Sequence, residues 1–214
     1  MSTPASWLDN LILELDTSLK TLFPPQKRSH DRPSPATGLD EPDLSPVEQK
    51  HVAGLMRVNH SGEVCAQALY QGQGMTARLP NVREQMRQAA AEETDHLAWC
   101  ETRLSELKSQ PSLLNPIWYS GSFVMGALAG LMGDRYSLGF VAETERQVSE
   151  HLQNHLQKCP VQDDKSRAIL ERMNEDETRH AEAAVNAGGA TLPRPVQNLM
   201  ALVSKLMTTS SYYL

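Results

Sequence analysis

Apolar residues recur along this chain at the three- and four-residue spacing of amphipathic helices. Beyond residue 45 this pattern predicts helices over residues 46–76, 80–108, 134–158, 163–187 and 196–207. The first begins sharply, because Ser45, Pro46 and Glu48 supply the capping hydroxyl, the proline and the reciprocal carboxylate of a helix start. Gly188 and Gly189 provide a stop after the fourth. The chain is therefore predicted to be all-α.

An uncharged stretch over residues 109–133 separates two pairs of these helices. Its strongly apolar part, residues 117–132, is short for a membrane span, which needs about 20 predominantly apolar residues. Gly126 and Gly130 have the spacing that lets another helix approach closely. Two interpretations stay open: a buried crossover helix, and a surface that dips into a bilayer or receives a lipid-like substrate.

The N-terminal part divides into a short helix and a linker. The stripe over residues 7–23 consists of Trp7, Leu8, Leu11, Leu15, Leu19 and then Leu22 or Phe23. This helix is either an arm packed on the bundle or a membrane-surface helix. Residues 24–46 are rich in Pro, Ser and Asp without a period, which is typical of a linker that could be mobile. We expect an arm and linker over residues 1–45 and one helical domain over residues 46–214.

Two tetrapeptides, Glu93-Thr94-Asp95-His96 and Glu177-Thr178-Arg179-His180, each place a carboxylate and an imidazole on one side of a helix. A further glutamate lies on an apolar stripe ahead of each motif: Glu63 comes 30 residues before the first and Glu145 comes 32 residues before the second. Glu143 lies off that stripe, so Glu145 is the better candidate. Two Glu helices and two Glu-x-x-His helices supply the ligand set of a carboxylate-bridged di-iron or di-manganese four-helix bundle.

The charge of these side chains supports the same interpretation. Glutamates are almost never fully buried unless paired, and the inward stripes carry no Lys or Arg. Two divalent cations would balance four carboxylates, and two imidazoles would fill further positions; Fe, Mn and Zn accept such ligands. A single Glu-x-x-His is more often a solvated pair on an exposed face. The complete set of six on four stripes argues against that alternative.

Other chemically active residues lie near the stripes. Asp95 and Asp176 are candidates to orient an imidazole from outside the ligand set. Cys65 and Cys100 are interpreted as core fillers rather than ligands. Three more histidines lie off the main stripes and are expected to be satisfied polar or surface residues: His60, His151 and His155.

Composition excludes several classes. The net charge of −6 and the absence of a Lys/Arg cluster argue against a nucleic-acid partner. Three cysteines without a C-x-x-C pair favour a reducing compartment, and the N-terminus shows no secretory signal, so we expect a bacterial cytosolic setting. Gly72-Gln73-Gly74 is not a G-x-G-x-x-G fingerprint, so any electrons must come from outside the chain.

These residues resemble the demethoxyubiquinone hydroxylase family, ferritin-like di-iron monooxygenases of ubiquinone biosynthesis. The resemblance covers about residues 48–207 and rests on both Glu-x-x-His motifs, on Glu145 and on the segment Arg57-Val58-Asn59-His60-Ser61-Gly62-Glu63. Asn59 stands where some members have aspartate. The implied fold is a ferritin-like four-helix bundle with an extra apolar crossover helix and a C-terminal helix. The implied iron ligands, with Glu93 and Glu177 or their counterparts bridging, are Glu63, Glu93, His96, Glu145, Glu177 and His180.

The family hydroxylates the ring of a polyprenylated demethoxyquinol with O2, taking 5-demethoxyubiquinol to demethylubiquinol late in ubiquinone biosynthesis. The resemblance thus implies two Fe ions per chain, O2 as co-substrate and a reduced nicotinamide as candidate electron donor. It also implies peripheral attachment to the cytoplasmic side of the bacterial inner membrane, where a prenylated quinol lies. A homo-oligomer or a complex with other proteins of ubiquinone biosynthesis stays open.

Two rival functions remain at this point. One is a ferritin- or rubrerythrin-like protein that binds iron or scavenges peroxide, which would not need the uncharged glycine-rich helix. The other is a metal-free helical protein that binds lipid through the same apolar segment.

Overall fold

The computed structural model describes residues 7–24, 28 and 31–214. In these residues the regular structure is helical, without strands, and the elements are α1 (Trp7–Leu22), α2 (Pro46–Thr76), α3 (Pro80–Glu106), α4 (Asn115–Leu131), α5 (Asp134–Lys158), α6 (Asp164–Asn186) and α7 (Arg194–Tyr213). The predicted all-α fold is confirmed. The capping box at the start of α2 is also present, since the Ser45 side chain accepts from the Glu48 backbone N–H and the Glu48 carboxylate accepts from that of Ser45.

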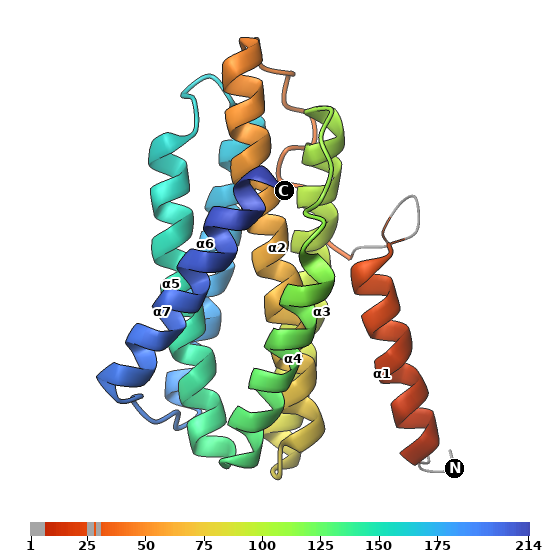
Figure 1. Ribbon diagram of the computed structural model, residues 1–214, viewed down its shortest axis with the longest axis vertical. Helices are drawn as coiled ribbons and strands as arrows, with labels where there is room; N and C mark the ends of the chain where they lie inside the picture. Colours follow the sequence, from red (N-terminus) through yellow and green to blue (C-terminus); the bar gives the residue numbers. More distant parts are fainter. Residues whose placement is uncertain (1–6, 25–27, 29–30) are drawn as a thin grey trace.

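Four long helices, α2, α3, α5 and α6, form the bundle, with α2 packed on α3 and α5 packed on α6 (Figure 1). The uncharged segment forms α4, which runs along α2 and joins the two helix pairs. The last helix, α7, lies across the outside of α2 and α5. The bundle, the crossover helix and the C-terminal helix are therefore arranged as expected.

Close contact between α4 and α2 depends on glycine. A Cβ atom on Gly126 would collide with the backbone of Leu69, and one on Gly72 would collide with the backbone of α4. This face of α4 is buried, which confirms the crossover interpretation for it, while the opposite face exposes Ile117, Val124 and Leu128. No helix of the described residues is long and apolar enough to cross a membrane.

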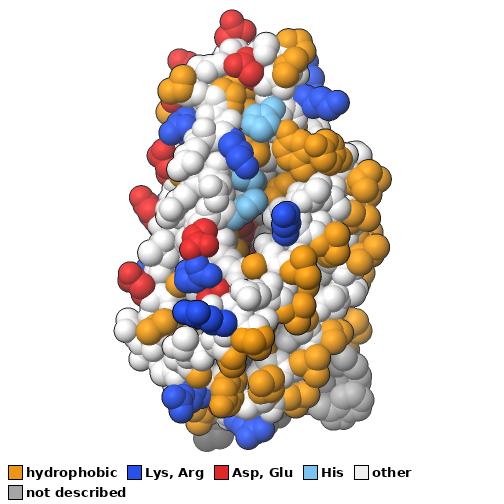
Figure 2. Space-filling model, turned by 60° about the vertical axis from the view of Figure 1, so that its left-hand side comes forward, with side chains coloured by type: hydrophobic (Ala, Val, Ile, Leu, Met, Phe, Trp, Pro, Cys, Tyr) orange, Lys and Arg blue, Asp and Glu red, His pale blue; other side chains and the backbone are white. Residues whose placement is uncertain are grey.

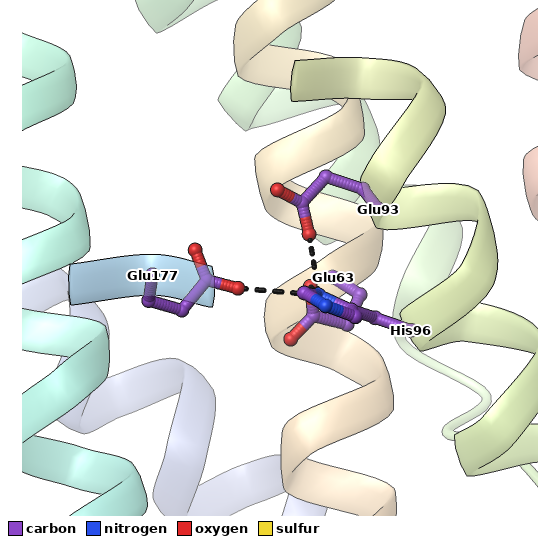
Figure 3. A group of neighbouring side chains, drawn as sticks. All are labelled: Glu63, Glu93, His96 and Glu177. Atoms are coloured by element: carbon purple, nitrogen blue, oxygen red, sulfur yellow. Dashed lines mark hydrogen bonds and ion pairs between the residues drawn. The ribbon is translucent and has the colours of Figure 1, made fainter. Parts of the chain in front are cut away.

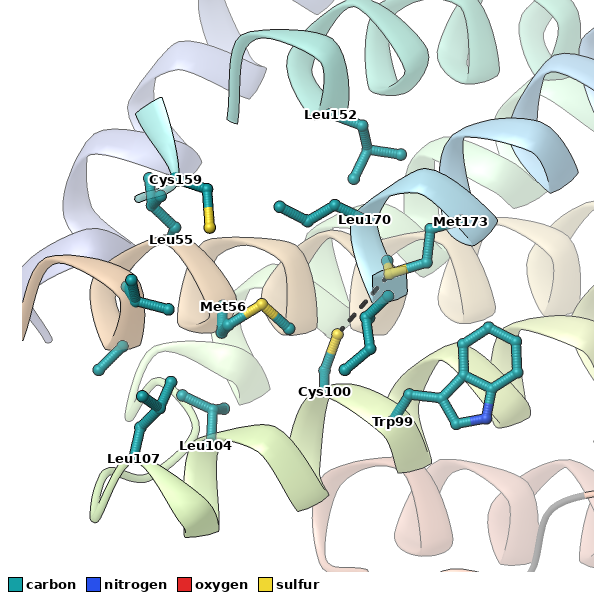
Figure 4. Packing of buried hydrophobic residues seen from close by; sticks show 13 residues of the cluster. Leu55, Met56, Trp99, Cys100, Leu104, Leu107, Leu152, Cys159, Leu170 and Met173 are labelled. Atoms are coloured by element: carbon teal, nitrogen blue, oxygen red, sulfur yellow. Dashed lines mark hydrogen bonds between the residues drawn. The ribbon is translucent and has the colours of Figure 1, made fainter. Parts of the chain in front are cut away.

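A sulfur-rich core fills one end of the bundle (Figure 4). Met56, Cys100 and Met173 are fully buried there, and the Cys100 thiol lies 3.9 Å from the Met173 sulfur. Trp99 borders this core and also stacks obliquely against His96, with ring centroids 5.2 Å apart. Cys100 is thus a core residue, as expected.

The first helix, α1, directs polar groups toward the bundle. The Tyr119 hydroxyl donates to Ser18 Oγ at 2.8 Å, and the Gln71 side-chain amide donates to the Glu14 carbonyl at 2.7 Å. Leu22 packs against the bundle, whereas four other apolar residues point outward and are more than half exposed: Ile12, Leu15, Leu19 and Phe23. The side chains of Trp7, Leu8 and Leu11, which belong to the predicted stripe, lie outside the described residues.

The described residues between α1 and α2 are anchored to the bundle by ion pairs. The Arg28 guanidinium lies 2.8 Å from Glu101, and Glu41 lies 2.9 Å from the buried guanidinium of Arg103. This part of the segment therefore packs on the domain, whereas the sequence pattern suggested a linker.

The last helix is longer than the predicted 196–207 and reaches Tyr213. Residues 208–211 are Thr and Ser, so the apolar period ends before the helix does. Tertiary contacts hold the extension: the Tyr212 ring packs over Gly54, and the Arg57 guanidinium donates to the Tyr212 carbonyl at 2.7 Å.

Candidate metal centre

Three helices bring four acidic and imidazole side chains to one buried point. Glu63 extends from α2, Glu93 and His96 from α3, and Glu177 from α6, and Figure 3 shows them pointing toward one another. One ligand atom of each lies within 4.8 Å of the others, and each residue is at most 2% exposed. They occupy positions in the stripes that face the bundle axis, where apolar residues would otherwise stand.

Glu145 of α5 and His180 of α6 complete the cluster. Nδ1 of His180 lies 3.3 Å from Glu177 Oε2 and 3.5 Å from Glu93 Oε1. Glu145 is buried, interacts electrostatically with both of those glutamates, and accepts a hydrogen bond from the Tyr70 hydroxyl. The structure therefore brings together all six residues that the sequence indicated, and their role as ligands stays a prediction.

Burial and neighbouring charge set the protonation of the cluster. Burial, and then the charge of Glu93, raise the pKa of Glu63 well above its usual range, and burial followed by the neighbouring glutamates does the same to the pKa of Glu145. Burial acts to raise the pKa of Glu93, but the adjacent histidines have the larger combined effect and hold this pKa well below its usual range. Burial also opposes charge on the histidines, yet the carboxylates raise the pKa of His96 far above its usual value and that of His180 to about 12. Protons on the imidazoles thus offset the buried negative charge when no metal is bound.

The outer nitrogen of each histidine contacts an acidic residue that comes directly before the other Glu-x-x-His motif in the sequence. Nε2 of His96 lies 3.1 Å from Asp176 Oδ2, and Nε2 of His180 lies 3.1 Å from Glu92 Oε2. Such contacts fix the orientation of each ring, with Nδ1 facing the cluster. The contact with an imidazole that the predicted orienting role requires is therefore present for Asp176. Glu92 was not predicted, because it lies off the inner stripe, and its place directly before Glu93 is the one signal that could have indicated it.

Asp95, in contrast, does not take the orienting role that the sequence suggested. Its carboxylate accepts a hydrogen bond from the Arg32 side chain at 2.6 Å and another from the Asp31 backbone N–H at 2.8 Å. The structure also shows the Tyr70 hydroxyl donating to Glu145, a contact that the sequence analysis did not predict. Both contacts join residues far apart in the sequence, so helical spacing alone could not indicate them.

Two of the histidines off the main stripes, His60 and His155, are satisfied polar residues, as expected. The expectation is wrong for His151, which is half-buried and whose Nε2 has no hydrogen-bond partner among the described residues. His60 is buried between the Glu101 carboxylate and the Asn115 amide, each 3.2 Å from a ring nitrogen. Nδ1 of His155 lies 3.1 Å from the Asn59 side-chain oxygen. Asn59, the departure from the family pattern, therefore binds a histidine outside the cluster.

The cluster has the donor set of a two-metal site. Buried oxygens of three members, Glu93, Glu145 and Glu177, have no hydrogen-bond partner among the described residues. Buried acceptors without a hydrogen bond are costly, and cations between these oxygens would satisfy all three. Four carboxylates and two imidazoles without a thiolate suit iron or manganese better than a structural zinc site. The residues present thus fit a pair of divalent ions.

An apolar groove of about 360 Å³ lies between α2, α4, α5 and α7, and Gly62, the residue before Glu63, is part of its lining. Its lining includes Leu69, Ile117, Met125, Phe140 and Met207. A smaller cavity of about 30 Å³, which shares Gly62 and Met207 with the groove, is lined by Glu63 itself. The groove therefore lies next to a cavity that reaches one carboxylate of the cluster.

A four-helix bundle that gathers four glutamates and two histidines belongs to the ferritin-like class, and a solved structure agrees. The bacterioferritin-related dodecameric thioferritin of Bacteroides fragilis superposes with a TM-score of 0.55 at 17% identity, over 64% of this chain and 84% of that chain. This likeness concerns the fold alone.

The sequence comparisons identify the family. The model of the ubiquinone biosynthesis protein COQ7 family matches residues 50–211, and the chain belongs to this family. A protein of Legionella pneumophila is 63% identical over 210 residues, which span 98% of this chain and 99% of that protein. One of Acinetobacter baylyi is 60% identical over 207 residues, 97% of each chain. Both relatives are named 3-demethoxyubiquinol 3-hydroxylase. The family match confirms the resemblance found in the sequence and favours it over an iron-storage or peroxide-scavenging function.

Proposed function

We propose that this chain hydroxylates the ring of a prenylated demethoxyubiquinol, the activity that names its relatives, at a centre of two iron ions. The observation that carries the proposal is the apolar groove, which shares lining residues with a small cavity lined by Glu63 of the buried cluster. A storage protein has no need of such a groove, and a lipid carrier has no need of six buried ligand residues. An enzyme that acts on a prenylated ring needs both.

Six side chains would hold the two ions: Glu63, Glu93, His96, Glu145, Glu177 and His180. Bound there, iron would supply the activation of O2 that ring hydroxylation requires. One oxygen atom enters the ring and the other leaves as water, so two electrons and two protons must be supplied. A reduced nicotinamide is our candidate donor.

The chain's own residues position these groups and exclude water. Asp176 and Glu92 fix the two imidazoles, and the Tyr70 hydroxyl fixes one oxygen of Glu145. The groove would bind the prenyl tail along Ile117 and Met207 and direct the ring toward Glu63. The burial of all six residues keeps bulk water from the reacting centre.

We further propose that the protein binds peripherally at the cytoplasmic face of a bacterial inner membrane. Figure 2 shows hydrophobic side chains gathered along one edge of the molecule, with most of the charged side chains away from it. Exposed apolar residues of two of the helices that border the groove support this surface: Ile117, Val124, Leu128 and Leu131 of α4, and Leu199, Leu202 and Leu206 of α7. A prenylated substrate could pass from the bilayer into the groove without crossing water.

The central proposal is tested by loading the chain with Fe(II) without oxygen and counting the metal. A demethoxyubiquinol, reduced nicotinamide and ¹⁸O-labelled O2 are then added. We expect about two iron ions per chain and one labelled oxygen atom in the product ring. A product oxygen that comes from water, or no conversion by the fully loaded protein, would refute the proposed function.

A further inference from the structure

Arg32, from the segment before α2, joins the two halves of the bundle at the level of the cluster. Its Nε lies 2.6 Å from Asp95 on α3, and its Nη1 lies 2.7 Å from Asp176 on α6. Both aspartates are almost completely buried, at 3% and 1% exposure. Two buried carboxylates repel each other, and the planar guanidinium can pair with both at once, which a lysine ammonium cannot do with the same geometry.

Arg32 is itself held in a defined place. The Asp31 backbone N–H donates to Asp95, and the Trp99 indole N–H donates to the Arg32 carbonyl at 3.3 Å. The guanidinium also lies over the Trp99 ring, 5.1 Å from its centroid. Backbone and side chain of Arg32 are therefore fixed by the helix that carries His96.

We infer that Arg32 is a positioning residue for the metal centre, which acts on His96 through Asp176. The Asp176 Oδ2 atom accepts from the Arg32 guanidinium and also lies 3.1 Å from His96 Nε2. The other oxygen of Asp176 is held by Arg179 at 2.7 Å. Loss of Arg32 would free the oxygen that meets the imidazole and leave the rest of the carboxylate in place.

The second histidine has a different support. His180 contacts Glu92, and Glu92 pairs with Arg179 at 2.6 Å. Arg179 also holds the outer oxygen of Asp176, but Arg32 takes no part in the contacts of His180, which come from α3 and α6. Removing Arg32 should therefore loosen the ion beside His96 and spare the ion beside His180. This asymmetry separates a positioning role from a general loss of stability.

The inference rests on the proposed two-metal centre and is independent of the substrate. The test loads the wild-type chain with Co(II) alone and follows its visible absorption while a chelator removes the metal. In Arg32→Gln we expect one of two release phases to become about tenfold faster, as is typical when an outer partner of a metal-binding histidine is lost, with the other unchanged. Arg32→Lys should fall between Arg32→Gln and the wild type.

The matched control is Arg28→Gln, which removes a buried arginine of the same segment that pairs with Glu101 and does not contact either aspartate. It should leave both release phases unchanged. Equal acceleration in Arg28→Gln, or unchanged release in both Arg32 variants, would overturn the inference. A wild-type chain that binds no metal would instead refute the proposed centre, and circular dichroism confirms that each variant is folded.

Discussion

Glu93 and Glu177 share both histidines of the cluster. Each directs one carboxylate oxygen to Nδ1 of His96, at 3.0 and 3.2 Å, and the other to Nδ1 of His180, at 3.5 and 3.3 Å. These two glutamates thus span the two imidazoles. If a metal ion were held at each Nδ1 in place of the proton, each glutamate would have one oxygen near each ion. This geometry supports the bridging role that the family resemblance assigned to them.

Glu145 and Glu143 provide a first comparison on one helix. Glu145 faces the cluster, whereas Glu143, although buried, pairs with Arg146 at 2.7 Å away from the cluster. We expect Glu145→Ala to abolish hydroxylation and to lower the metal content, because it removes a ligand. Glu143→Ala should retain most of both. Metal analysis and product formation check this, and the reverse order would show that the assignment on α5 is wrong.

Tyr70 offers a test of the support around the ligands. Its hydroxyl donates to Glu145, so Tyr70→Phe removes one hydrogen bond and leaves the ring in place. Partners of this kind typically contribute about 10- to 100-fold to metal affinity or activity, and we expect a loss in that range. Tyr119→Phe is the matched control, since its hydroxyl contacts Ser18 and Gln71 outside the cluster. Equal losses in the two variants would argue against a role for the Tyr70 contact.

Metal binding should depend on pH in a defined direction. The raised pKa values of His96 and His180 mean that both imidazoles carry protons in the metal-free chain at neutral pH, and these protons must leave when metal binds. Apparent affinity should therefore rise with pH between about 6 and 8, with about two protons released from the histidines and more from Glu63 and Glu145. Calorimetric titration in two buffers of different ionisation enthalpy counts the protons. Binding without proton release would contradict the prediction.

The sequence was sufficient to predict the bundle and the six side chains that meet inside it, because both follow from helical spacing. The bounds of α5 agree with the prediction, with Gly133 before the helix and Pro160 just after it. Glu145 lies on a stripe and Glu143 lies off it, and the structure separates them in the same way. Such information is local to each helix, so no knowledge of the tertiary arrangement was needed.

Contacts between distant segments could not be predicted. Arg32 meets Asp176 across 144 positions of sequence, in a segment without any periodic pattern. Glu92 reaches the histidine of the other motif only because α3 and α6 lie side by side in the bundle. Likewise, α7 extends beyond its apolar period because Tyr212 contacts Gly54 and Arg57 of α2.

Gly126 and Gly121 test the packing of α4. A Cβ atom on Gly126 would overlap the backbone of Leu69, whereas one on Gly121 would meet nothing within 4 Å. We expect Gly126→Ala to lower the free energy of unfolding by about 1–3 kcal/mol, the usual cost of overpacking. Gly121→Ala should be neutral or should stabilise the helix by up to about 1 kcal/mol. Denaturant unfolding measures both, and equal stabilities would show that α4 does not need close contact with α2.

The exposed apolar face of α4 allows a direct test of membrane binding. Leu128, which is 56% exposed, lies on a helix that borders the groove, so a charge there would have to be inserted into the bilayer surface. Val185 of α6 is 58% exposed and lies on a helix that does not line the groove, and Val185→Asp is therefore the matched control.

We expect Leu128→Asp to weaken binding to anionic phospholipid vesicles by about tenfold or more, since burial of one leucine contributes about 1.5–3 kcal/mol. Val185→Asp should bind as the wild type does, and flotation with the vesicles measures both. The metal content of each variant should stay normal, because neither residue belongs to the cluster. Hydroxylation of a long-tailed quinol in vesicles should fall with binding in Leu128→Asp, whereas turnover of a short-tailed soluble quinol should persist. Loss of both activities to the same degree would mean that Leu128 acts on the site itself and not on access from the membrane.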